Sequence, residues 1–249
     1  MKKLLALLLA VCLFPAAVFA IELGEDVTGE AYWPEGTGPD DAVYVYRYAY
    51  PTVLGDSEEV GLINETFAYM IEDALAFKVP MDGEMLESTD VQAYTNELSR
   101  ITCNNDEYLS VLVVSEAFRG AAAQEVYYGY TFSLTGLRAG QPTSLPRLLG
   151  ILKDDESDTW MQERQTGKAN ELVWGLVWDA IEEMQDEGLV TFDPDLTYEM
   201  LTGNFYPEQD FYLDENGDPV FFIQAATIAS AADGVLTFPF TVEFLLDEI

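Results

Sequence analysis

The chain has 249 residues, 49% of them hydrophobic, which is enough for one large domain or two small ones with a substantial core. It carries 45 Asp and Glu against 11 Lys and Arg, a formal net charge of −34, and contains no histidine. The charge disfavours a nucleic-acid partner, because phosphates require cationic side chains. The missing histidine excludes Ser-His-Asp and Cys-His catalysis and histidine-ligated zinc. We therefore expect no cofactor and no catalytic residues.

The first twenty residues have the pattern of a secretory signal. Lys2 and Lys3 precede an apolar run at 4–14, and Val18 and Ala20 are small residues at the −3 and −1 positions of a cleavage site after Ala20. No later apolar stretch is long enough to span a bilayer, so we expect no membrane span after signal removal. We expect a secreted or cell-surface protein. Without Lys2 and Lys3, 9 basic residues face 45 acidic ones, a net charge of −36.

The N-terminal half predicts one strand and one helix. Residues 21–40 are acidic and rich in Gly and Pro, so we interpret them as an irregular leader. Residues 41–50 place four tyrosines at alternate positions, which predicts a strand. Residues 58–77 carry apolar side chains at helical spacing after Ser57, a suitable N-cap, which predicts a helix.

Three long strands are predicted next, at 91–103, 107–118 and 124–134. Turn sequences separate them at residues 104–106 and around Gly120. Short connections between consecutive strands predict an antiparallel meander.

The C-terminal half mixes helices and strands. The predicted elements are a short helix at 143–152, a long helix at 160–187, a helical turn at 195–201, a hairpin centred on Asn216-Gly217 and a last strand at 236–246. Residues 172–184 of the long helix are apolar nearly all round, so we expect them to be largely buried. Because strands and helices come in blocks, the fold class is α+β, as a single domain over 41–249.

Acidic residues offer the one weak candidate for a metal site. Asp154, Asp155, Glu156 and Asp158 supply oxygen ligands of the kind that bind cations, but a solvated loop is the default interpretation of this segment and we expect no metal there. The acidic turn at 214–218 begins like a calcium loop, but Pro219 and Ala225 occupy the positions that require Gly and Glu. Of the four tryptophans, Trp174 and Trp178 are expected in the core, and Trp33 is the exposed candidate for a carbohydrate site.

Several short, loosely matching motifs resemble a known extracytoplasmic domain of unknown function. They lie at residues 108–111, 130–136, 143–149, 211–217 and 228–234, and the strand and helix before them also fit. The family is the domain shared with the C-terminal region of the lysozyme-sensing anti-sigma-V factor and of a peptidoglycan deacetylase. Here the turn at 120–124 lacks the family's histidine, Ser230-Ala231 replaces its Pro-Tyr pair, and Arg147 stands where it has an Asp.

The resemblance implies a sensor-like binding domain, and the partner known for the family is a cationic lysozyme. The leading hypothesis is therefore a secreted, non-catalytic binding module of unknown ligand, with a cationic protein such as lysozyme or a cell-wall component as the candidates. The negative charge would attract a cationic partner. One alternative is a carboxylate-dependent hydrolase of cell-wall glycans, which needs two buried carboxyls facing each other across a cleft. The other is an acidic structural or cation-binding surface protein.

Overall fold

The computed structural model describes residues 21–86 and 91–249, so the predicted signal sequence and the predicted cleavage site at Ala20 lie outside the described residues. It confirms the α+β class. The strands are β1 (Val27–Trp33), β2 (Tyr44–Tyr50), β3 (Ala93–Asn104), β4 (Tyr108–Phe118), β5 (Gln124–Ser133), β6 (Phe211–Leu213), β7 (Pro219–Ile223) and β8 (Leu236–Pro239). The α-helices are α1 (Glu58–Asp73), α2 (Val79–Leu86), α3 (Leu145–Leu148), α4 (Thr159–Glu187), α5 (Tyr198–Asn204) and α6 (Val242–Asp247).

The strands form two sheets. The first has the order β1-β2-β3-β4-β5 and the second β6-β7-β8. Among the strands of the described residues, β2 and β3 are the one parallel pair, because the chain crosses between them through α1, a π-helical segment η1 (Ala74–Lys78) and α2. The remaining pairs are antiparallel, and β3-β4-β5 is the predicted meander.

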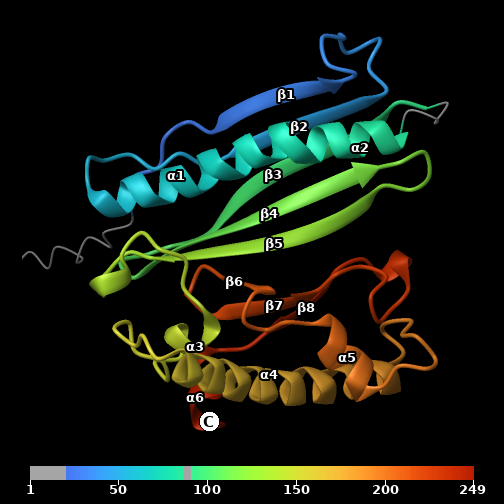
Figure 1. Cartoon of the computed structure of the whole chain (residues 1–249). Coiled ribbons are helices and arrows are strands. Elements are labelled where there is room, and N and C mark those ends of the chain that lie inside the picture. The colour runs from blue at the N-terminus through green and yellow to red at the C-terminus, as the bar shows by residue number, and fades with distance from the viewer. Residues whose placement is uncertain (1–20, 87–90) are drawn as a thin grey trace, which may run out of the picture.

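The molecule is built in four layers, helix, sheet, sheet and helix (Figure 1). On β5, Tyr130 and Phe132 point to α1, where their rings pack edge-on against Phe67. Tyr127 points the other way and packs edge-on against Phe222 of β7. Because alternate side chains of a strand face opposite sides, β5 lies between α1 and the second sheet. Helix α4 covers the far face of that sheet (Figure 1).

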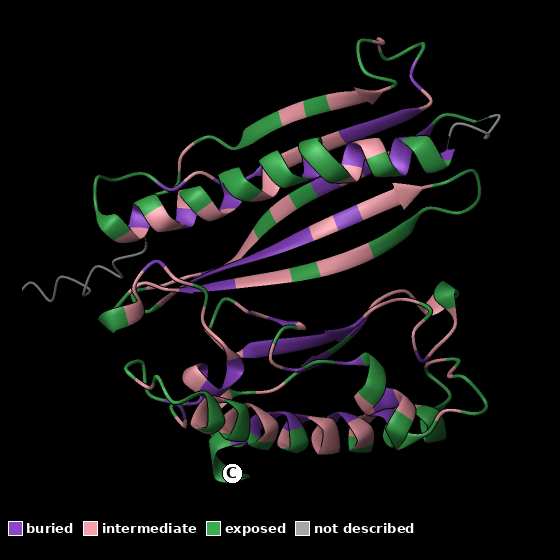
Figure 2. Cartoon of the chain, in the orientation of Figure 1, coloured by how far each residue is buried: buried purple, intermediate pink, exposed green. Residues whose placement is uncertain are grey.

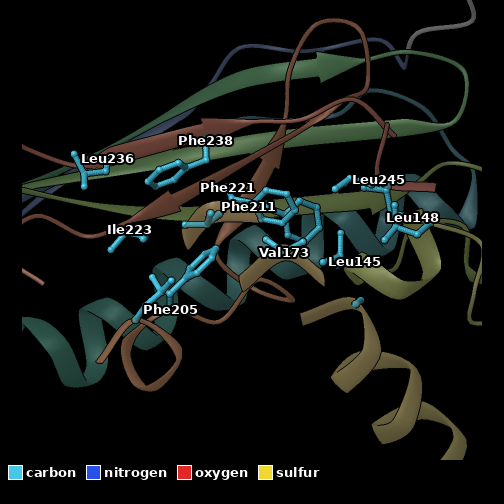
Figure 3. Packing of buried hydrophobic residues seen from close by; sticks show 14 of the residues in the cluster. Leu145, Leu148, Val173, Phe205, Phe211, Phe221, Ile223, Leu236, Phe238 and Leu245 are labelled. Carbon is cyan, nitrogen blue, oxygen red and sulfur yellow. The ribbon is translucent and has the colours of Figure 1, made fainter. Parts of the chain in front are cut away.

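The core divides along these layers. Under α1, η1 and α2, apolar side chains of the first sheet form two clusters, and tyrosines of β2 belong to both. A larger cluster joins α3, α4, α5 and α6 to the second sheet (Figure 3). Figure 2 shows that β4 and β7 are buried along most of their length, whereas α1 and α4 expose their outer faces.

The long helix α4 is less buried than expected. Within residues 172–184, only Val173, Val177 and Ile181 are buried, because α4 lies on the surface of the second sheet and contacts it along one face. Trp174 and Trp178 are half-buried beside this cluster, and their indole N–H groups donate to the carbonyl of Phe205 and to Glu182.

Two further expectations were wrong. The leader contains strand β1, which pairs with β2 from Val27 to Trp33. Gly29 allows this pairing, because a Cβ there would collide with the ring of Tyr48. At the other end, the predicted strand 236–246 ends at Pro239, and α6 follows because the Thr241 hydroxyl caps it by accepting from the N–H of Phe244.

Candidate functional site

A pocket lies where the edge of β5 meets the second sheet. It has a volume of about 430 Å³. Its lining residues are Tyr127, Tyr128, Gly129, Tyr130, Thr131, Pro142, Thr143, Glu208, Gln209, Asp210, Phe211, Phe222 and Gln224. Small-ligand sites have volumes of roughly 300–1,000 Å³, so this pocket is suited to a small group or a short chain segment.

Strand β5 supplies the aromatic wall. Tyr127, Tyr128 and Tyr130 all line the pocket, although they belong to both faces of the strand, so the pocket wraps around the strand edge. Burial, together with the nearby Tyr128 and Glu97, raises the pKa of Tyr130 to about 12. That hydroxyl therefore stays neutral at physiological pH. Tyrosine rings attract cations through their negative faces and stack on planar groups.

A loop before β6 supplies the acidic wall. The carboxylate of Asp210 accepts from the N–H of Tyr206 at 2.8 Å, and that of Glu208 accepts from the side chain of Asn170 at 2.6 Å. Burial raises the pKa of Asp210, and the negative charge of Glu208 adds to this, against the opposing effect of the Tyr206 hydrogen bond. The raised pKa means that the charged form of Asp210 is poorly stabilised by its surroundings.

Neither carboxylate has a basic partner within the part of the chain that the structure describes. The ion pairs there join Arg47 to Glu30, Lys78 to Glu97, Arg119 to Asp82 and Arg147 to Asp154. Asp210 and Glu208 thus bring negative charge without a basic partner to a pocket that three tyrosines also line. Such a pocket favours a cationic group over a neutral or anionic one.

A second polar cluster lies beneath α1 and η1. Glu97 on β3 is buried and accepts hydrogen bonds from the hydroxyls of Tyr46 and Tyr50, at 2.6 and 2.7 Å. Ser115 donates to it at 3.3 Å, and Lys78 forms an ion pair with it. Burial by itself would raise the pKa of Glu97, but Lys78 and the tyrosine hydroxyls outweigh it and lower the pKa.

This cluster is satisfied internally. Every donor named above is directed at one carboxylate, and Lys78 also lies 5.7 Å from the ring centre of Tyr46. The π-helical turn that carries Lys78 brings its ammonium group over the sheet. We assign the cluster to anchoring the crossover helix, because a saturated carboxylate has little capacity left for a ligand.

The acidic residues expected to offer a metal site are not brought together. Asp158 caps α4 by accepting from the N–H of Trp160, and Glu156 accepts from the N–H of Asp158. Asp154 faces Arg147 at 4.0 Å. Across residues 21–86 and 91–249, no group of three or more Asp, Glu, Cys or His has an arrangement that could hold a metal ion. Trp33 also differs from its prediction, since it is half-buried against the cluster under α2.

The sequence did not predict the pocket, because the residues that line it come from segments far apart along the chain. Tyr127 and Gln224 are 97 positions apart, and Asp210 is one of 45 acidic residues. The ion pair of Lys78 could have been anticipated from the sequence, because Lys78 is one of only 11 basic residues and interrupts an apolar stretch. A lone cation in such a stretch indicates a buried partner of opposite charge.

No helix of the described residues combines the length and the apolar composition that a membrane crossing requires.

No protein-family model matches the chain, and no curated protein matches it. Two solved structures resemble it over most of its length. One is a DUF3298 family protein from Pseudomonas aeruginosa PAO1, with 12% identity, a TM-score of 0.51 and coverage of 92% of this chain and 94% of that one. The other is a DUF3298 member from Bacteroides fragilis, with 15% identity, a TM-score of 0.45 and coverage of 91% and 92%. The first of these likenesses shows that this chain shares the fold of that DUF3298 family protein.

Proposed function

We propose that this protein is an exported, non-catalytic module that binds a cationic protein or a cationic cell-wall component through the pocket beside β5. The observation that carries the proposal is the pair of carboxylates without a basic partner among the described residues, Asp210 and Glu208, in a pocket that tyrosines also line. Export is supported by the signal pattern of residues 1–20. The formal charge of −34 would speed the arrival of a positively charged partner.

The geometry favours binding over glycan hydrolysis. Asp210 and Glu208 belong to one loop, two positions apart, and the opposite wall of the pocket carries tyrosines and Thr131. A hydrolase places its two carboxyls on either side of the scissile bond. The pocket also distinguishes this proposal from a purely acidic surface protein, for which dispersed charge would suffice.

Calorimetry with a cationic lysozyme tests the proposal. The family resemblance makes lysozyme the first probe, and an unrelated protein of similar negative charge is the control. We expect stoichiometric binding that persists at about 0.3 M salt, where simple attraction between exposed charges is largely screened. Weak heat that matches the control and disappears with salt would remove lysozyme as the partner.

Variants then locate the site. Asp210→Asn keeps the hydrogen bond to Tyr206 but removes the charge, and Asp179→Asn on the exposed face of α4 is its matched control. Tyr128→Ala is matched by Tyr198→Ala, because the two tyrosines are 42% and 43% exposed. We expect only the pocket variants to weaken binding. Equal effects of the pocket and control variants would contradict the assignment of the site.

A further inference from the structure

The outer edge of β5 has a regular pattern of hydrogen bonds. The N–H and C=O of Tyr127 bond the side-chain amide of Gln224, at 3.0 and 2.7 Å. The carbonyl of Thr131 accepts from the N–H of Thr143 at 2.7 Å, and Ser133 bonds Gln141 and Gly140. These residues alternate along the strand, so their backbone groups all point away from β4.

Gly129 stands between Tyr127 and Thr131 and has the same orientation. Within the described residues, neither its N–H nor its C=O has a hydrogen-bond partner on that side. Gly129 also lines the pocket. The strand edge therefore presents one donor and one acceptor, without partners among the described residues, to the space that a ligand would occupy.

The side chain of Gln224 shows which chemical groups can bind the outer edge of β5. Its carboxamide offers one donor and one acceptor to Tyr127, as the backbone of a neighbouring strand would. A peptide group carries the same pair of functions. An extended peptide can therefore continue the pattern by one residue at Gly129. The side chain of Gln224 at Tyr127 and the loop residue Thr143 at Thr131 flank the gap and limit the pairing to that residue.

We infer that the ligand of this pocket is a peptide segment, one residue of which pairs with the N–H and C=O of Gly129 while a basic side chain meets Asp210 and Glu208. The inference rests on the proposed function and names the chemistry of the partner. The tyrosines would flank the basic side chain, and Arg is the better fit because its planar guanidinium stacks on aromatic rings and pairs with carboxylates. Two parts of the ligand would thus determine specificity: its main chain, which pairs with Gly129, and the positive charge of its side chain.

Four probes separate these parts in a titration followed by NMR of the purified protein. They are acetyl-Ala-Arg-Ala-amide, the same peptide N-methylated at Arg, n-butylguanidinium and chitotriose. We expect the peptide to bind about fivefold more tightly than its N-methylated form, which is the range for one hydrogen bond, and to shift the amide resonance of Gly129. The butylguanidinium ion carries the charge without the main chain, so it should bind more weakly than the peptide and leave the Gly129 amide unshifted.

The same titration on Asp210→Asn tests whether the two contributions are independent. The variant should weaken the peptide and butylguanidinium by a similar factor, and the ratio between the peptide and its N-methylated form should stay the same.

Each outcome decides between the two proposals. If all three cationic probes bind alike and shift the resonances of Tyr128 and Asp210, the peptide inference is overturned and the cation-binding function stands. If none of the four shifts the pocket resonances up to millimolar concentration, both are overturned. Binding of chitotriose alone would also overturn both and make the site a glycan site.

Discussion

The side chain of Gln224 bonds both backbone groups of Tyr127, at 3.0 Å from the N–H and 2.7 Å to the carbonyl oxygen. Gln224 follows β7, so this pair of hydrogen bonds joins the second sheet to the edge of the first. A side-chain amide here takes the place of a strand.

Replacing Gln224 should therefore lower the stability of the protein. Gln224→Ala leaves the N–H and C=O of Tyr127 without their partners, and we expect it to lower the free energy of unfolding by about 1–2 kcal/mol. Urea denaturation followed by fluorescence measures this. Gln209→Ala is the control, because Gln209 is exposed in the same pocket and its side chain has no hydrogen bond within the described residues. Equal midpoints for the two variants would show that the bridge contributes nothing.

Gly129 is expected to tolerate no side chain. A Cβ at this position would collide with the carbonyl oxygen of Phe211 on β6, so the two sheets would have to separate. We expect Gly129→Ala to destabilise the protein by about 1–3 kcal/mol. Gly167→Ala should have the opposite sign, a gain of about 0.5–1 kcal/mol, because Gly167 lies inside α4 with nothing near an added Cβ. Thermal unfolding of both variants measures these changes in stability. An unchanged stability of Gly129→Ala would contradict the close approach of Gly129 to the carbonyl oxygen of Phe211.

Glu97 should make stability depend on pH. Its pKa is lower in the folded protein than its ordinary value of 4.5, so the folded state binds fewer protons than the unfolded one as acid is added. The contribution is fully present above about pH 4.5 and is lost as the pH falls through the lowered pKa.

Glu97→Gln is the variant that tests this linkage. It should be less stable at neutral pH and show a weaker loss of stability on acidification, as measured by urea unfolding from pH 7 to pH 3. Glu125→Gln, on the exposed end of β5, should follow the parent protein. The prediction fails if Glu97→Gln and the parent lose stability in parallel.

Asp210 should make cation binding depend on pH. Its pKa is raised from the ordinary 3.8 mainly by burial, to which the charge of Glu208 adds, so Asp210 becomes neutral at a higher pH than an exposed aspartate. We expect the affinity for acetyl-Ala-Arg-Ala-amide to decline as the pH is lowered through that raised pKa. In Asp210→Asn this step should be absent, and a step that persists unchanged would assign it to another group.

The exposed apolar residues of the crossover helix offer a test of packing. Phe77, Met81 and Met85 are 70%, 58% and 66% exposed, so they bury little surface. Phe77→Ser and Met85→Ser should each change the free energy of unfolding by no more than about 0.5 kcal/mol. Val79→Ala, a buried neighbour, should cost more, about 1–3 kcal/mol, and comparable losses at all three sites would contradict the burial pattern.

The sequence predicted those elements whose pattern is local. Alternating tyrosines located β2, turn residues separated β3, β4 and β5, and the Asn216-Gly217 pair located the hairpin of β6 and β7. The predicted helix at 58–77 is α1 and continues through η1 into α2.

The errors arise where tertiary contacts decide the conformation. Strand β1 follows an acidic, Gly-rich pattern and exists because the edge of β2 supplies its hydrogen bonds. The helix α6 depends on one cap at Thr241 inside a stretch of strand-forming residues. The pocket could not be predicted, because it requires Gly129, Asp210 and Gln224 to meet across the boundary of two sheets.

The four-layer arrangement influences how the two sheets could separate from each other. The apolar cluster of α4 and the second sheet is separate from those under α1, so each half can hold together while contacts between the sheets loosen. The pocket is made from both halves, and a ligand seated there would tie them together. Such a ligand should slow hydrogen exchange in β5 and β6 beyond the residues that it touches, because separation of the two sheets would first require its release.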